Sequence, residues 1–147
     1  MPKAEEWKTY ASAALYVSSD ELTPTMIAER LGLEPTRITI KGQPLRADPR
    51  YREPFNHFVL EVDRTQTVTS PGSAGRILEA VVEELLHRIE PVANRLDEIR
   101  DRVSLELMCA YGSSHKLETI RLSDALLQRI TALKLPFALA IVPHEEK

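Results

Sequence analysis

Residues 22–44, LTPTMIAERLGLEPTRITIKGQP, combine the signals of a helix, a tight joint and a strand, and this combination decides how the chain folds back on itself. Thr23 is a favoured N-cap residue, Pro24 suits the first helical position, and Gly32 suits the left-handed conformation that ends a helix. Pro35 prevents the helix from continuing and favours extended backbone just before it. The segment therefore predicts a short helix that ends at a joint and leads directly into a strand.

The strand after the joint, TRITIK at residues 36–41, alternates between apolar and polar side chains. Ile38 and Ile40 share one face, which is typical of a half-buried strand. The opposite face carries the side chains of Arg37, Thr39 and Lys41. These three outward side chains are candidates for contact with a partner.

The remaining elements follow from their apolar patterns. Strands are predicted by an uncharged run, by two alternating segments and by a closing segment apolar on both faces: residues 9–18, 56–65, 103–111 and 136–142. Helices are predicted by apolar residues at helical spacing: residues 77–89, 92–99 and 122–134. Pro91 breaks or kinks the first of these, and Ser123 is the N-cap of the last.

The predicted order is therefore β-α-β-β-α-β-α-β. Its first six elements have the split β-α-β pattern of ferredoxin-like folds, in which right-handed crossovers place two helices on one face of an antiparallel sheet. We expect a single two-layer α+β domain over residues 1–147, with a ferredoxin-like β-α-β-β-α-β core and a mainly antiparallel sheet. The C-terminal helix and strand extend this sheet on an edge that the sequence leaves open.

Composition excludes several classes of function. With 147 residues, of which 43% are hydrophobic and 28% charged, the chain is long and apolar enough to fold as one domain. A net charge of −3 gives no global attraction to nucleic acid or to an anionic membrane, so neither is an expected partner. Cys109 is the only cysteine, which excludes an internal disulfide, and no signal peptide is recognised. We expect a soluble, cytoplasmic protein.

A proline- and arginine-rich excursion at residues 42–55 separates two of the strands, because Pro44, Pro49 and Pro54 prevent a continuous ladder there. The segment from Thr36 to Arg52 concentrates positive charge, with Asp48 as its only acidic residue and five basic residues: Arg37, Lys41, Arg46, Arg50 and Arg52. Tyr51 lies beside these arginines, and a basic loop with an aromatic ring can bind phosphate, a carboxylate-rich partner or RNA. The alternative is a solvated loop whose charges answer an acidic helix that contains Glu79, Glu83 and Glu84.

Signals of catalysis are weak. Ser113, Ser114 and His115 lie together in a predicted loop, but adjacent residues rarely form a nucleophile–base pair. The four histidines are scattered and lack the spacing of metal ligands. Cys109 alternates with apolar neighbours and is expected to be an inert core residue. We therefore assign no catalytic residue, no metal ligand and no cofactor.

Residues 22–44 also resemble the start of a bacterial family of domains of unknown function, number 4279. The matching residues are Leu22, Pro24, Ile27, Leu31, Gly32, Leu33, Pro35, Thr36, Lys41 and Gly42. The later order of a long helix, a strand that ends in YGSS, a helix LSDALLQRITAL and a last strand is similar too, so the resemblance covers nearly the whole chain. The chain departs from the family where a Gly-x-Trp motif usually enters the third strand, because Asn56, His57 and Phe58 stand there. The resemblance implies an α+β fold and no established activity, and an association of some members with toxin-immunity genes hints at a binding role.

These observations favour a non-enzymatic protein-binding module, of the immunity type in one form, that uses the open face of its sheet and the basic excursion. The alternative is a sensor for a small anionic ligand or nucleotide, held between Arg37, Lys41 and the loop of Ser113, Ser114 and His115. An uncharacterised enzyme is the third hypothesis, and it requires carboxylates or histidines that converge in a polar pocket. A homodimer is a further expectation if the apolar final strand lies at an exposed edge.

Overall fold

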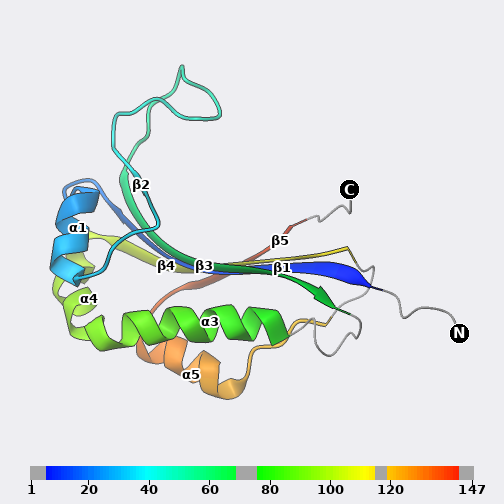
Figure 1. The fold of residues 1–147 in the computed structure, drawn as a ribbon. Helices are drawn as coiled ribbons and strands as arrows, with labels where there is room; N and C mark the ends of the chain where they lie inside the picture. The colour runs from blue at the N-terminus through cyan, green and yellow to red at the C-terminus, as the bar shows by residue number, and fades with distance from the viewer. Residues whose placement is uncertain (1–5, 69–75, 115–118, 143–147) are drawn as a thin grey trace, which may run out of the picture.

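The computed structural model describes residues 6–68, 76–114 and 119–142, which form two layers, a five-stranded sheet and a set of helices (Figure 1). The strands are β1 (Trp7–Ser19), β2 (Arg37–Thr39), β3 (Asn56–Val68), β4 (Ser104–Ser113) and β5 (Phe137–Ile141). Their order in the sheet is β2-β3-β1-β4-β5, and every neighbouring pair is antiparallel except β4 and β5, which are parallel. The predicted two-layer α+β fold with a mainly antiparallel sheet is confirmed, and the closing strand lies at the outer edge beside β4.

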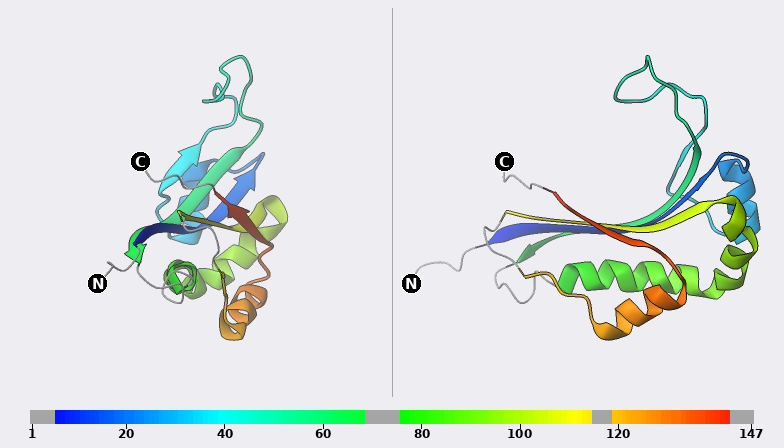
Figure 2. Two further views of the ribbon diagram at one scale, coloured as in Figure 1. Left: turned by 90° about the vertical axis from the view of Figure 1, so that its right-hand side faces the viewer. Right: turned by 180° about the vertical axis from the view of Figure 1, so that it is seen from behind.

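The helices lie on one side of this sheet or at its end (Figures 1 and 2). They are α1 (Pro24–Leu31), α3 (Arg76–Ile89), α4 (Ala93–Ile99) and α5 (Asp124–Ala132). Pro91 ends α3 as predicted, since residues Glu90–Val92 form a 3-10 turn between α3 and α4, and a second 3-10 turn, Arg100–Arg102, precedes β4. Ser123 caps α5, because its side chain accepts a hydrogen bond from the Leu126 N–H.

The joint after α1 has the predicted geometry. Thr23 accepts a hydrogen bond from the Met26 N–H at the start of α1. At the other end Gly32 has a φ of 69°, and the N–H groups of Gly32 and Leu33 both donate to the Ala28 carbonyl. This left-handed ending turns the chain from α1 into β2 and places β2 beside β3.

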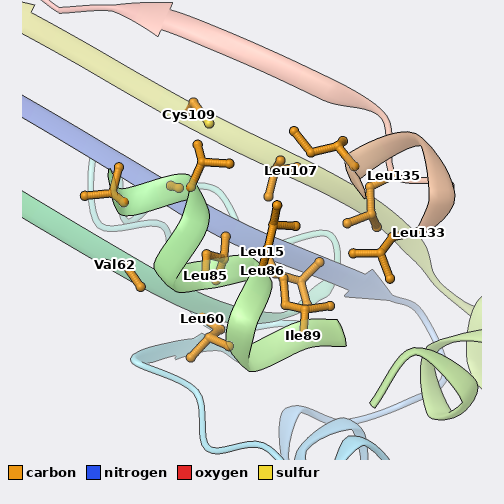
Figure 3. Close-up of a cluster of buried hydrophobic side chains, with 14 of the residues drawn as sticks. Leu15, Leu60, Val62, Leu85, Leu86, Ile89, Leu107, Cys109, Leu133 and Leu135 are labelled. Atoms are coloured by element: carbon orange, nitrogen blue, oxygen red, sulfur yellow. The ribbon is translucent and has the colours of Figure 1, made fainter. Parts of the chain in front are cut away.

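The core lies between the sheet and α3. Leu85, Leu86 and Ile89 of α3 point toward the sheet (Figure 3). Leu15 of β1 meets them at the centre of the sheet, where its neighbours in register are Leu60 of β3 and Leu107 of β4. Further buried positions on the same face are Ala11, Ala13, Val17, Phe58, Val62 and Cys109. Burial raises the pKa of the Cys109 thiol to about 12, so the residue is a protonated core side chain at neutral pH.

Strand β2 differs from its prediction. The sequence predicted a half-buried strand over 36–41, but only Arg37–Thr39 pair with β3, and Ile38 and Ile40 are exposed. The reason is that β2 is an edge strand, which has a neighbouring strand, β3, on one side only. Strands β1 and β3 are longer than predicted and pair with each other from Trp7↔Val68 to Ser19↔Asn56.

Arg129 joins α5 to the rest of the helical layer. Its Nη1 lies 2.6 Å from Glu83 Oε2 on α3, and its Nε and Nη2 lie 3.0 Å and 2.5 Å from the two carboxylate oxygens of Glu90. The bidentate hydrogen bonds from Arg129 lower the pKa of the Glu90 carboxyl below its usual value, and Glu90 in turn raises the pKa of Arg129.

Replacement of Arg129 with methionine is expected to lower the free energy of unfolding at pH 7 by about 1 kcal/mol, a value reduced for solvent screening because both partners are partly exposed. Since the pKa of Glu90 is lower in the folded state, its contribution is fully present above the unfolded pKa, near about 4.3, and is lost as the pH falls through the folded value. Urea unfolding at pH 7 and at about pH 3 measures the difference between variant and wild type, which should shrink in acid. Arg88→Met, which removes an exposed ion pair with Glu84, is the matched control. A difference that does not change with pH would contradict this account.

Candidate functional site

The face of the sheet opposite α3 and α5 has no helix over it in the described part of the chain (Figures 1 and 2). We call this surface the open face. The strand register assigns these side chains to it: Arg37 and Thr39 of β2, His57, Val59, Glu61 and Asp63 of β3, Tyr10, Ser12, Ala14, Tyr16 and Ser18 of β1, and Glu106 and Met108 of β4. The predicted outward orientation of Arg37 and Thr39 therefore agrees with the register.

Arg37 has partners within the open face. Its Nη2 lies 3.2 Å from Glu61 Oε2 and donates a hydrogen bond to the Tyr16 hydroxyl. Its guanidinium carbon lies over the Tyr16 ring, 5.6 Å from the ring centroid. These contacts cover Val59, which is buried although it lies on the open face. Arg37 is thus held in one orientation and still exposes part of its guanidinium to solvent.

Lys41 ties the start of the excursion to the sheet. Its N–H donates to Asn56 Oδ1 at 2.9 Å, and its Nζ lies 3.1 Å from Asp20 Oδ1. Asn56 is one of the few buried polar residues, so this hydrogen bond fixes the point at which residues 42–55 leave β3.

The excursion at residues 42–55 rises on the same side of the sheet as the open face (Figures 1 and 2). Its outgoing and returning segments are joined by backbone hydrogen bonds between Gly42 and Glu53, between Glu53 and Gln43, and between Leu45 and Tyr51. Only an isolated bridge between Pro44 and Arg52 is added to these, in agreement with the predicted effect of the prolines. The excursion is therefore a hydrogen-bonded arm that stands out from the sheet.

The charges of this arm are partly neutralised by its own residues. The Nε and Nη2 atoms of Arg50 lie 3.0 Å and 2.8 Å from the two carboxylate oxygens of Asp48. The side-chain hydrogen bond from Arg50 lowers the pKa of Asp48 and raises that of Arg50. Arg52 has a contact of 3.5 Å to the Gly42 carbonyl, and among the described residues no carboxylate lies within ion-pair distance of Arg46 or Arg52. These two arginines are the cations that the arm offers to a partner.

The acidic residues of α3 that were expected to balance the arm form ion pairs elsewhere. Glu83 is paired with Arg129 and His87, and Glu84 is paired with Arg64 and Arg88. The basic residues near the arm instead find Glu61, Asp20 and Asp48. The alternative interpretation of the arm was therefore wrong about the residues that balance it.

Aromatic residues are exposed at the tip and base of the arm. Tyr51 is 60% exposed at the tip, where the guanidinium carbon of Arg50 lies 5.9 Å from its ring centroid. Phe55 is 41% exposed at the base, and its ring meets the His57 ring edge-on with the centroids 6.5 Å apart. Phe55 and His57 thus connect the base of the arm to the open face.

A hollow of about 290 Å³ lies beside Phe55, where β1 ends and β4 begins. Its lining residues are Ser18, Ser19, Asp20, Glu21, Phe55, Asp101, Arg102, Val103 and Ser104. Arg102 Nη2 lies 3.0 Å from Glu21 Oε2, so Glu21 neutralises the charge of Arg102 within the hollow. Sequence reasoning missed this hollow, because its residues come from separate segments and form no motif.

Ser18 and His57 form a hydrogen bond at the edge of the hollow, with 2.7 Å between Ser18 Oγ and His57 Nδ1. The two residues are cross-strand neighbours in the register of β1 and β3. A catalytic serine–histidine pair also needs a group that orients the base, and in the described part of the chain no carboxylate is hydrogen-bonded to His57. No group of three or more potential metal ligands occurs among these residues either. The geometry fits a structural cross-strand contact.

The second half of the predicted ligand site lies elsewhere. Ser113 pairs with Thr9 of β1, and Ser114 exchanges hydrogen bonds with Lys8, 3.0 Å from the Lys8 N–H to Ser114 Oγ. Arg37 lies beside Tyr16, seven positions further along β1, which corresponds to roughly 23 Å at about 3.3 Å per residue. His115 lies outside the described residues. The structure therefore does not bring Ser113 and Ser114 together with Arg37 and Lys41.

Comparison with known proteins places the chain in a family. The sequence profile described as "Domain of unknown function (DUF4279)" matches residues 6–143. The chain belongs to this family. The residues of the open face, the arm and the hollow all lie within the matched range. No curated protein and no solved structure shows significant similarity to the chain. None of the helices in its described parts has the length and apolar character needed to cross a membrane.

Proposed function

We propose that this DUF4279 domain is a non-enzymatic, cytoplasmic protein-binding module of bacteria, of the immunity type, that engages a folded protein partner. One observation carries the proposal: the arm rises on the open-face side of the sheet (Figure 1), and Phe55 at its base contacts His57 of the open face. The two surfaces therefore adjoin, and we call the angle between them the corner. A corner of this kind fits a convex partner on two sides. The single cysteine of the chain, Cys109, is compatible with a reducing compartment such as the cytoplasm, because the fold uses no internal disulfide.

The residues that line the corner are those that contribute most to protein interfaces. Tyrosine, phenylalanine and arginine are enriched at binding hot spots, and Tyr51, Phe55 and Arg52 expose these side chains along the arm. The backbone hydrogen bonds between the outgoing and returning segments of the arm, together with the Arg50–Asp48 ion pair, restrict the motion of these side chains before binding. Such preorganisation reduces the entropy lost on association, so binding energy is retained.

Charge defines the chemistry of the partner. The arm offers Arg46 and Arg52, so the partner presents carboxylates to it. The open face offers Glu61, Asp63 and Glu106 around Arg37, so the matching surface of the partner is mainly basic. A partner with these two patches is recognised by complementarity and needs no cofactor.

Affinity capture from bacterial lysate, with wild-type and variant domains as baits, tests this function. Tyr51→Ala is expected to weaken retention of the partner about tenfold or more, the usual effect of truncating an aromatic hot spot. Leu127→Ala is the matched control, because Leu127 is similarly exposed at 44% but lies on α5, in the helical layer. With the captured partner, changing Arg46 and Arg52 to Glu should slow association and reduce its salt dependence. A partner that all variants retain equally would overturn the proposal.

The hollow beside Phe55 is the one observation that favours a small-ligand sensor. Its volume of about 290 Å³ is at the lower limit for ligand pockets. Three carboxylates line it, those of Asp20, Glu21 and Asp101, against the single guanidinium of Arg102, so it disfavours phosphate. Thermal-shift screening with nucleotides and with small cationic metabolites would test this second function, since a ligand at 100 times its Kd raises stability by about 2.7 kcal/mol.

A further inference from the structure

Strand β5 forms the outer edge of the sheet, and the structure describes no strand beyond it. Pro136 and Val142, which flank β5, direct their backbone groups toward β4, as the hydrogen bonds from the Leu107 N–H to Pro136 O and from the Val142 N–H to Tyr111 O show. In a parallel ladder the bonding residues alternate, so the same direction holds for Ala138 and Ala140. The N–H and C=O groups of Phe137, Leu139 and Ile141 therefore point away from the sheet.

The side chains of these three residues are also only partly covered. The register with β4 places Phe137, Leu139 and Ile141 on the helix side of the sheet, opposite Leu107, Cys109 and Tyr111. All three are nevertheless exposed, with Leu139 at 41% and Ile141 at 66%. Helix α3 packs mainly against β1 and β3 at the centre of the sheet, and α5 packs against α3, so the main helix contacts lie away from the edge strand β5. An apolar strip thus lies along a strand edge with which no described strand pairs.

Natural edge strands are usually protected by charges, prolines or bulges. Within Phe137–Ile141 there is no charged residue and no proline. The backbone of β5 is regular, because all five of its residues pair in continuous register with β4. Nothing in β5 itself opposes the addition of another strand.

We propose that β5 pairs with β5 of a second copy of the chain, antiparallel and across a two-fold axis at Leu139, so that the two sheets become continuous. In this register Leu139 faces its own symmetry mate, and Phe137 faces the Ile141 of the other copy, so the large apolar side chains meet on the helix side. Ala138 and Ala140 meet on the other side and leave room for close approach. The outward N–H and C=O groups of all three odd-numbered residues in each copy find partners in this register.

We infer a second copy of the chain as the pairing partner because the sequence of β5 is complementary to itself. A two-fold axis requires each residue to be compatible with its symmetry partner, and like charges facing each other would oppose this. Every pair in the register centred on Leu139 is apolar, and the large–large and small–small matches occur on opposite faces. The arm emerges between β2 and β3, at the other edge of the sheet, so the dimer leaves the corner accessible and carries two copies of it.

Sedimentation velocity of the purified chain between about 1 and 200 μM tests the dimer, because an interface of one short strand pair corresponds to a weak, concentration-dependent association. We expect the wild type to shift from monomer to dimer across this range. Leu139→Glu and Leu139→Lys should each remain monomeric, since the two-fold axis places like charges opposite each other. An equimolar mixture of the two variants should dimerise again, because Glu then faces Lys.

Leu127→Glu is the matched control, with the same change at a similarly exposed leucine of α5, and should dimerise like the wild type. Ile141→Glu is a second variant at a more exposed position, which should weaken the dimer without disturbing the fold. Hydrogen exchange adds a local readout: the amides of residues 137, 139 and 141 should become protected at high concentration. A wild-type chain that stays monomeric at the highest concentration would overturn the proposal, and so would a Leu139→Glu dimer or a mixture that fails to associate.

Discussion

Replacing Phe58 with alanine is expected to lower the free energy of unfolding by about 3–5 kcal/mol, the range for removing a large aromatic side chain from a core. Phe58 is fully buried, and its neighbours in register are Val17 of β1 and Ile38 of β2. Because β2 is an exposed edge strand, little other apolar surface can move in to fill the cavity. Helix α1 packs on β3 in the same region, so the loss also weakens the docking of α1.

Urea denaturation of Phe58→Ala measures this effect directly, and Phe55→Ala is its control. Phe55 is three residues away and has the same side chain, but it is exposed at the base of the arm. Its replacement should change the free energy of unfolding by no more than about 0.5 kcal/mol. Equal effects of the two substitutions would mean that Phe58 does not fill the core as the structure places it.

The position of Phe58 bears on the departure that the family resemblance implied. There the resemblance implied a Gly-x-Trp motif, and this chain has Asn56, His57 and Phe58. In the structure Phe58 provides a large aromatic side chain to the core, and Asn56 uses its Oδ1 to hold the Lys41 backbone. Phe58 therefore supplies the large aromatic side chain of this part of the core.

The sequence predicted elements whose signals are local. Thr23, Gly32 and Ser123 act through residues no more than five positions away, so the caps and the joint could be recognised from spacing alone. The alternation in β3 and β4 likewise identified their core faces. The same alternation of side chains along a strand predicted that Arg37 lies on the open face.

Features that depend on distant segments could not be predicted. The pairing of Arg37 with Glu61 and Tyr16 requires the register of β2 with β3 and of β3 with β1. The exposure of Ile38 follows from the edge position of β2, and alternation carries no information about strand order. The position of β5 and the hollow beside Phe55 have the same origin, since both arise where segments far apart in sequence meet.

Ser19→Ala is expected to lower the free energy of unfolding by about 2–4 kcal/mol, because one hydroxyl serves three backbone groups. Ser19 Oγ accepts hydrogen bonds from the N–H groups of Glu21 and Leu22, at 3.2 Å and 3.0 Å, and donates to the Arg102 carbonyl at 2.9 Å. Ser19 and Leu22 are buried, so the substitution leaves the Leu22 N–H without its partner at a buried position and also removes the hydrogen bond to the Arg102 carbonyl.

Ser18→Ala is the matched control at the adjacent position. Ser18 is only partly buried and bonds to His57 Nδ1, so its replacement should cost no more than about 1 kcal/mol. Urea unfolding compares the two variants, and hydrogen exchange at the Leu22 amide reports the local loss. A Ser19→Ala variant as stable as Ser18→Ala would contradict the assigned role.

The hydrogen bonds of Ser19 also support the walls of the hollow beside Phe55. Ser19 holds the chain before α1 and the turn before β4 against each other, and the side chains of Glu21 and Arg102 that these segments carry form an ion pair across the hollow. If the backbone network around Ser19 supports these walls, the exposed carboxylate of Asp101 can be neutralised by Asp101→Asn without loss of stability. Any change in ligand binding by that variant would then report the charge of the hollow and not its collapse, which separates the sensor hypothesis from the binding role of the arm.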